Sequence, residues 1–312
     1  MSVAACLLLY AVLAATVAPP LLSWPARTGW APRAAVAAWL AVVGSVVTSW
    51  TAGAVGMTVD VVDNWRQPDP MGLSVCLARL FSVSTGTGLL IEAVLATLSL
   101  TVAVVAAVRV IRVMHGGRVR GRRHAESARM VGRQLAGLDG ILVEAPNKLV
   151  YCVGGKAGVV VVTSAALDAL SRPQLLAVLD HERAHVSGGH HGLIAVTKAL
   201  AAAMPRMKLF TVAHADIAQL VEMCADDAAA RRHGTPVLLA AMLALAGGGP
   251  MPVGALGANG IGIVGRINRL HRPGTATQRW GSRITLAASS CAFIAAPLWV
   301  AVGLGTCVLM VA

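Results

Sequence analysis

The chain has 312 residues, of which 56% are hydrophobic and only 13% are charged. Soluble domains usually carry about 25% charged residues, so the composition excludes an ordinary soluble protein and indicates a membrane protein. The net charge of +12 would also suit a nucleic-acid-binding protein, but the placement of the basic residues gives a different explanation.

Four stretches are long and apolar enough to cross a membrane as helices. They are Val3–Leu22, Ala35–Met57, Gly88–Val108 and Ile284–Val311. No Lys or Arg precedes Arg27, so the first stretch lacks the basic leader of a cleaved signal peptide and is expected to be a retained span. We therefore predict a mainly α polytopic protein with three spans in residues 1–110, an α+β domain in 111–283 and a fourth span in 284–312.

The basic residues gather in three places that alternate with the spans. They are Arg27 and Arg33 after the first span; Arg109, Arg112, Arg118, Arg120, Arg122, Arg123, Arg129 and Arg133 after the third; and Arg266, Arg269, Arg272, Arg279 and Arg283 before the fourth. The segment between the second and third spans instead holds Asp60, Asp63 and Asp69 against Arg66 and Arg79. The positive-inside rule then predicts a plasma-membrane protein with both termini outside and the large domain in the cytoplasm. The arginines are expected to face anionic lipid, and no direct nucleic-acid binding is expected.

The predicted domain begins, after the arginine-rich segment, with a β-hairpin at Leu149–Thr163. Gly154 and Gly155 are expected to form its turn, and the β-branched run Val159–Val162 its second strand. Ser171 and Gln174 fit a capping box that opens a helix running into His181. The shorter apolar runs Gly192–Met204 and Val237–Ala246 are predicted to be buried helices rather than spans.

The predicted helix that begins after Ser171 carries the pattern H-E-x-x-H over His181 to His185. Positions i and i+4 share one helix face, so both imidazoles can reach one ion. A catalytic zinc takes three protein ligands and leaves one position for water. Glu182, beside the two histidines, is placed to accept the proton of that water. The motif thus predicts a single zinc ion and needs a third ligand from elsewhere.

Two candidates for the third ligand remain open on the residues alone. Gly188 and His191 complete the metzincin pattern H-E-x-x-H-x-x-G-x-x-H, although His190 and His191 could simply be solvated. Alternatively, Glu222 and Asp226 share a face of a predicted helix at Val212–His233. Glu222 would then bind the metal while Asp226 accepts a hydrogen bond from a ligand imidazole.

The hairpin, the helix LLAVLDHERAH, the later E-x-x-A-D from Glu222 to Asp226 and the order of spans resemble the BlaR/MecR membrane metallopeptidases. These are gluzincins related to HtpX and the CAAX prenyl proteases. The resemblance implies zinc ligands at His181, His185 and Glu222, with Glu182 as the catalytic base and Asp226 as a supporting residue. It also implies that the hairpin lines the active-site cleft and pairs with an extended substrate.

One departure concerns sensing. The β-lactam sensors of that family carry a penicillin-binding domain after the fourth span, whereas this chain ends at Ala312 and contains no S-x-x-K. Direct covalent sensing of a β-lactam is therefore not expected. The residue that stabilises the oxyanion is not identified, and the candidates are Arg231, Arg232, His214 and His233.

The function expected from this sequence is regulatory cleavage of a protein substrate, such as a BlaI-type winged-helix repressor. The alternatives are an HtpX-like protease that degrades membrane proteins and a non-catalytic membrane transducer that keeps a zinc ion. The expected partners are a protein or peptide substrate and the lipid bilayer.

Overall fold

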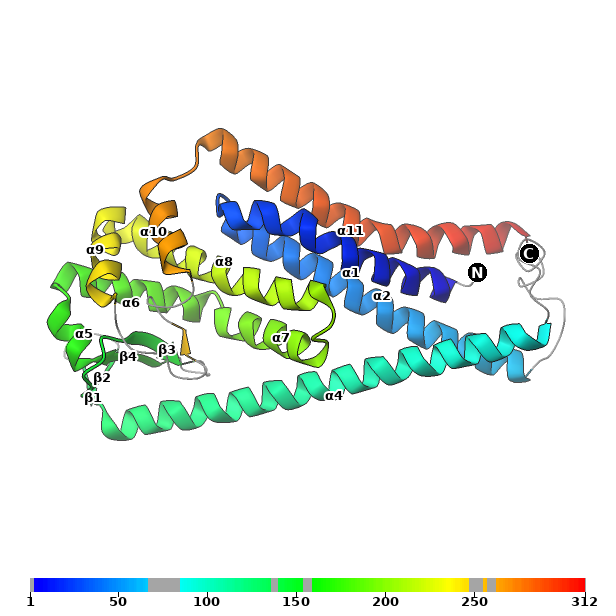
Figure 1. Ribbon diagram of the computed structural model, residues 1–312, viewed down its shortest axis with the longest axis horizontal. Helices are drawn as coiled ribbons and strands as arrows, with labels where there is room; N and C mark the ends of the chain where they lie inside the picture. The colour runs from blue at the N-terminus through cyan, green and yellow to red at the C-terminus, as the bar shows by residue number, and fades with distance from the viewer. Residues whose placement is uncertain are drawn as a thin grey trace.

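The computed structural model describes residues 3–66, 85–135, 140–153, 159–246, 255–256 and 262–311. Its longest helices are α1 (Val3–Thr28), α2 (Pro32–Arg66), α4 (Thr85–Val131) and α11 (Ala276–Val311). In Figure 1, α1, α2 and α11 run side by side, and α4 extends along the length of the molecule to the sheet. The start of α1 and the end of α11 lie at the same end of the molecule, opposite the sheet.

Three helical segments within the described residues are long and apolar enough to cross a membrane: Val3–Thr28, Pro32–Val62 and Leu90–Val131. The first two segments contain the first two predicted spans, and the third covers the predicted span Gly88–Val108 from Leu90 onward. The fourth predicted span lies within the continuous helix α11 and stays a prediction. The predicted boundary at residue 110 falls inside α4, because this helix continues without a break through the arginine-rich segment to Val131.

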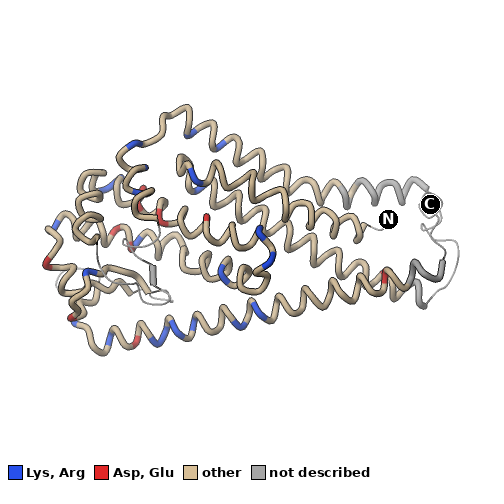
Figure 2. The backbone as a smooth tube through the Cα atoms, viewed as in Figure 1, with Lys and Arg blue, Asp and Glu red and all other residues tan. Residues whose placement is uncertain are grey.

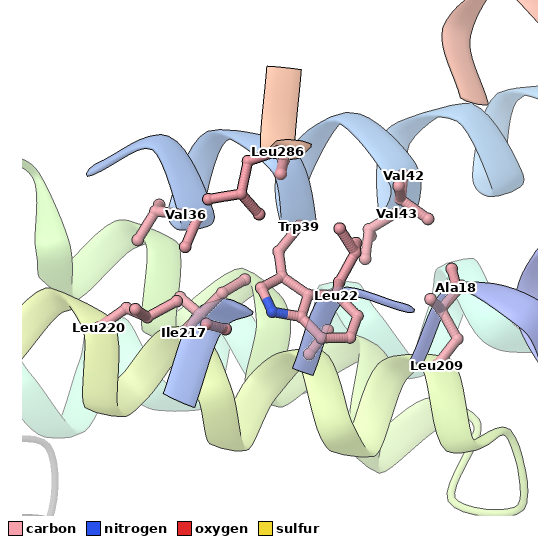
Figure 3. Close-up of a cluster of buried hydrophobic side chains, with 14 of the residues drawn as sticks. Ala18, Leu22, Val36, Trp39, Val42, Val43, Leu209, Ile217, Leu220 and Leu286 are labelled. Atoms are coloured by element: carbon pink, nitrogen blue, oxygen red, sulfur yellow. The ribbon is translucent and has the colours of Figure 1, made fainter. Parts of the chain in front are cut away.

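The helix bundle and the expected water-facing domain share one core. Trp39 of α2 is fully buried, and Figure 3 shows it among Leu22 of α1 and Ile217 of α8 (Lys208–His233). Leu209 and Leu220 of α8 and Leu286 of α11 belong to the same cluster. Helix α8 therefore joins the bundle to the rest of the molecule.

A small sheet lies at the other end of the molecule. Its strands are β1 (Arg133–Gln134), β2 (Ile141–Val143), β3 (Val150–Val153), β4 (Val159–Thr163) and β5 (Ala255–Leu256), in the order β1-β2-β4-β3-β5. Strands β2 and β4 are parallel, and the other pairs are antiparallel. The predicted hairpin is thus confirmed as β3 and β4, whereas its expected Gly154–Gly155 turn lies outside the described residues.

Helices cover both faces of the sheet. Val150 and Cys152 pack, with α6 (Arg172–Ser187) and α9 (Thr235–Leu245), into a cluster on one face. The alternate residues Tyr151 and Val153 pack toward α4 on the other face. This alternation is the period-2 pattern of a strand buried on both sides. The short α5 (Ser164–Ala169) follows β4 directly.

Helix α6 begins as the sequence predicts. The backbone N–H of Ser171 donates to Oε1 of Gln174 at 2.8 Å, which is one half of the predicted capping box. At its end, Gly189 adopts φ +62°, a left-handed conformation that glycine adopts without strain, and the chain turns into α7 (His190–Ala203). Helix α10 (Ile263–His271) packs against α8 and α9 through Leu270 and partly buried isoleucines.

Candidate metal centre

Helices α6 and α8 bring together the two histidines of H-E-x-x-H and Glu222. The Nε2 atoms of His181 and His185 are 3.1 Å apart. The Glu222 carboxylate lies 3.6 Å from Nε2 of His181 and 3.5 Å from Nε2 of His185. One ligand atom from each of these three buried residues lies within 4.8 Å of the others. Two imidazoles and one carboxylate are a donor set typical of catalytic zinc, so these residues fit the ion.

Asp226, one turn after Glu222, supports this cluster from behind. Its Oδ1 lies 3.2 Å from Nδ1 of His181, the ring nitrogen that faces away from Glu222. Burial opposes protonation of His181, but the hydrogen bonds to Asp226 and Glu222 raise its pKa to about 9. A carboxylate behind a ligand imidazole fixes the orientation of the ring and raises its basicity.

A buried arginine, Arg266 of α10, faces the two carboxylates of α8. It donates through Nε and Nη2 to Asp226 and through Nη1 to Glu222. Burial alone would raise the pKa of Asp226, but the charge and hydrogen bonds of Arg266 hold it well below its usual range. Glu182, the residue after His181, is fully buried as well, so three carboxylates lie in this buried region together with Arg266. A divalent cation would offset their negative charge.

Residues 119–248 match the model of Peptidase family M48. The match covers less than half of the chain and includes the three candidate ligands together with Glu182 and Asp226. Together with the cluster, it points to a metallopeptidase, and M48 peptidases typically depend on zinc. No curated protein and no solved structure matches the chain.

His190, within the M48 region, is buried, which contradicts the expectation that it could be a solvated residue. Its Nδ1 lies 3.0 Å from Nδ1 of His185, on the side of that ring opposite Glu222. A Cβ on Gly188 would come within 2.4 Å of Nε2 of His190, so the glycine leaves the space that this ring fills. Local spacing gave no sign of this contact, because it depends on the sharp turn at Gly189.

We expect His190→Ala to weaken zinc binding by about 10- to 100-fold, as is typical for the loss of a residue that orients a metal ligand. The physical reason is that Nδ1 of His185 loses its partner and the ring can rotate. Competition with a chromophoric chelator would measure the affinity. His214→Ala is a suitable control, because His214 bonds Thr197 between α7 and α8. Equal zinc affinities for the His190 variant and the wild type would contradict this role.

His191 points to the sheet of the M48 region. Its Nε2 lies 3.1 Å from the backbone oxygen of Cys152 and 3.6 Å from its Sγ. Burial, together with the charge of Glu182 and a hydrogen bond to it, raises the pKa of the Cys152 thiol. Strand β3 therefore passes beside Glu182 at Cys152, which places one strand of the predicted hairpin next to the candidate site.

Three of the four candidates for oxyanion stabilisation are engaged elsewhere. His233 and Arg232 pair with Asp180 at 2.8 and 3.3 Å, and His214 bonds Thr197. Arg231 is exposed near the end of α8. The basic group that bonds both Glu222 and Asp226 is instead Arg266. The sequence indicated it only as part of the basic segment before the fourth predicted span.

Proposed function

We propose that the chain is an integral-membrane zinc endopeptidase with its catalytic region in the cytoplasm. The observation that carries this proposal is the buried cluster of His181, His185 and Glu222, with Glu182 next to the first histidine. The M48 match and the apolar helices that pack against α8 support it.

His181, His185 and Glu222 would hold the ion, which when bound activates water and polarises the scissile carbonyl. Glu182 accepts the proton of the attacking water and then delivers it to the leaving amine. Oδ1 of Asp226 lies 3.2 Å from Nδ1 of His181, and a carboxylate at this position favours the ring orientation in which Nε2 is directed at the ion. Each of these five side chains is at most 2% exposed, so they are shielded from bulk water.

The proposed substrate is an extended segment that pairs with β3, since this strand passes beside Glu182 at Cys152. Strand β5 pairs with the same edge at Cys152 and Val153. A substrate that pairs at these two residues must therefore displace β5. Among the described strands, Val150 and Tyr151 pair only with β4, so pairing at these residues displaces no described strand.

The resemblance to the BlaR/MecR peptidases makes a BlaI-type winged-helix repressor the first substrate to test. The full chain, purified in detergent, should contain one zinc ion by elemental analysis and should cleave such a repressor. Cleavage of misfolded membrane proteins but not of the repressor would favour an HtpX-like role. Bound zinc without cleavage of either would favour a non-catalytic transducer, and a chain without zinc would reject the proposal.

We also expect a cytoplasm-only reporter to be active when it is fused after Arg123 and inactive when it is fused after Asp63. The reason is the arginine excess that follows the third span. Figure 2 shows Lys and Arg along the part of α4 nearest the sheet and at the turns of the bundle that face it. The reverse pattern of reporter activity would place the metal centre outside the cell.

A further inference from the structure

The side chain of Arg266 is completely buried and makes three short hydrogen bonds to two carboxylates. Nε lies 2.8 Å from Oδ2 of Asp226, and Nη2 lies 2.6 Å from its Oδ1. Nη1 lies 2.9 Å from Oε2 of Glu222. One edge of the planar guanidinium thus binds the aspartate through two bonds, and the remaining nitrogen reaches the glutamate.

This geometry requires arginine specifically. A lysine ammonium has its charge on one atom and cannot span both carboxylates with the same rigid fork. A buried guanidinium is costly to desolvate unless its hydrogen bonds and charge are matched, and the carboxylates of α8 match both here. Removing it would leave Glu222 and Asp226 buried at 2% and 0% exposure without their counter-charge.

The bond to Oε2 restrains the rotation of the Glu222 carboxylate. Oε1 then faces Nε2 of His185 at 3.5 Å, on the side where the ion would sit. The two bonds to Asp226 likewise hold the carboxylate that faces Nδ1 of His181. One arginine therefore contacts one candidate ligand directly and a second ligand through its supporting aspartate.

Helix α10 itself is fixed one turn later by Arg269. Its Nη2 donates to Asp227 at 2.6 Å, and its Nε donates to the carbonyl of Gly29, between α1 and α2, at 2.7 Å. A Cβ on Gly29 would lie 2.7 Å from Sδ of Met223, so this turn packs directly on the part of α8 that carries Glu222. Helix α10, which carries Arg266, is thereby tied both to α8 and to the turn between α1 and α2.

We propose that Arg266 is a positioning residue for the metal centre: its fork, bonded to Glu222 and Asp226, holds the third ligand and the partner of His181 in the geometry that binds zinc. This inference rests on the proposed zinc site. It assigns Arg266 no contact with substrate.

The deciding variant is Arg266→Lys, because it keeps the buried charge and removes the fork. Its matched control is Arg269→Lys, the same change on the same helix at a residue that bonds Asp227 and Gly29 instead. The full chain in detergent would be examined by zinc competition, by the visible spectrum of bound Co²⁺ and by thermal unfolding without metal.

We expect Arg266→Lys to bind zinc about 10- to 100-fold more weakly and to change the Co²⁺ spectrum. Arg269→Lys should lower the unfolding temperature while leaving both metal readouts as in the wild type. Arg266→Gln should weaken zinc binding further, and if it fails to fold, the lysine variant still decides.

If Arg266→Lys had the zinc affinity and the Co²⁺ spectrum of the wild type, the inference would be overturned, even if its activity or stability fell. Equal losses of zinc affinity in the two lysine variants would also overturn it, because the cause would then be the packing of α10. A wild-type chain that binds no zinc would instead refute the proposed function.

Discussion

Glu182→Gln should keep its zinc ion and lose peptide cleavage by about 100- to 10,000-fold, the usual contribution of a general base. Glutamine has the shape of glutamate but cannot accept the proton of the attacking water. Glu182 is fully buried beside His181, so an isosteric change preserves the packing of α6 and the positions of both histidines. Elemental analysis would measure the zinc, and the rate of substrate cleavage would measure the loss.

Glu144→Gln is the matched control, since Glu144 is exposed just after β2. It should cleave at the wild-type rate. Cleavage by Glu182→Gln at the same rate as this control would reject the assigned chemistry. Loss of zinc in Glu182→Gln would show instead that this carboxylate contributes to metal binding.

The parts of the structure that the sequence predicted depend on local periodicity. Hydropathy located the helices that contain the first three predicted spans, and the β-branched run located β4. The spacing of His181 and His185 placed both rings on one face of α6, because four residues make about one helical turn. Glu222 and Asp226 share a face of α8 for the same reason, and neither prediction needed the tertiary fold.

The parts that the sequence did not predict depend on contacts between distant segments. Arg266 lies 40 positions after Asp226, in the same basic segment as Arg269 and Arg272. The sequence therefore does not set it apart from these two arginines, whereas the structure shows that it is completely buried. The contact of His190 with His185 requires the turn at Gly189. The packing of α8 against α1 and α2 crosses the predicted domain boundary, and no local pattern encodes it.

Glu222→Ala should lose zinc and activity, whereas His191→Ala should keep most of both. Glu222 has one carboxylate oxygen within 3.6 Å of each of the two candidate ligand imidazoles and is held by Arg266. His191 has turned with α7 toward β3, where its Nε2 contacts the backbone oxygen of Cys152. Losing Glu222 should cost more affinity than the about 10- to 100-fold expected for an outer partner of a ligand.

Truncation of His191 should appear in stability instead, at about 1 kcal/mol for one hydrogen bond. Zinc content and thermal unfolding of the two purified variants separate these effects, because we expect a loss of zinc in the Glu222 variant and a loss of stability in the His191 variant.

Glu222→Gln controls for shape: it keeps the volume and an acceptor for Arg266 while it removes the charge that binds the ion. If His191→Ala lost its zinc and both Glu222 variants kept theirs, the third ligand would be His191 and the site would be metzincin-like. That result would require the turn at Gly188 and Gly189 to close further than it does here, bringing His191 from β3 to the two histidines of α6.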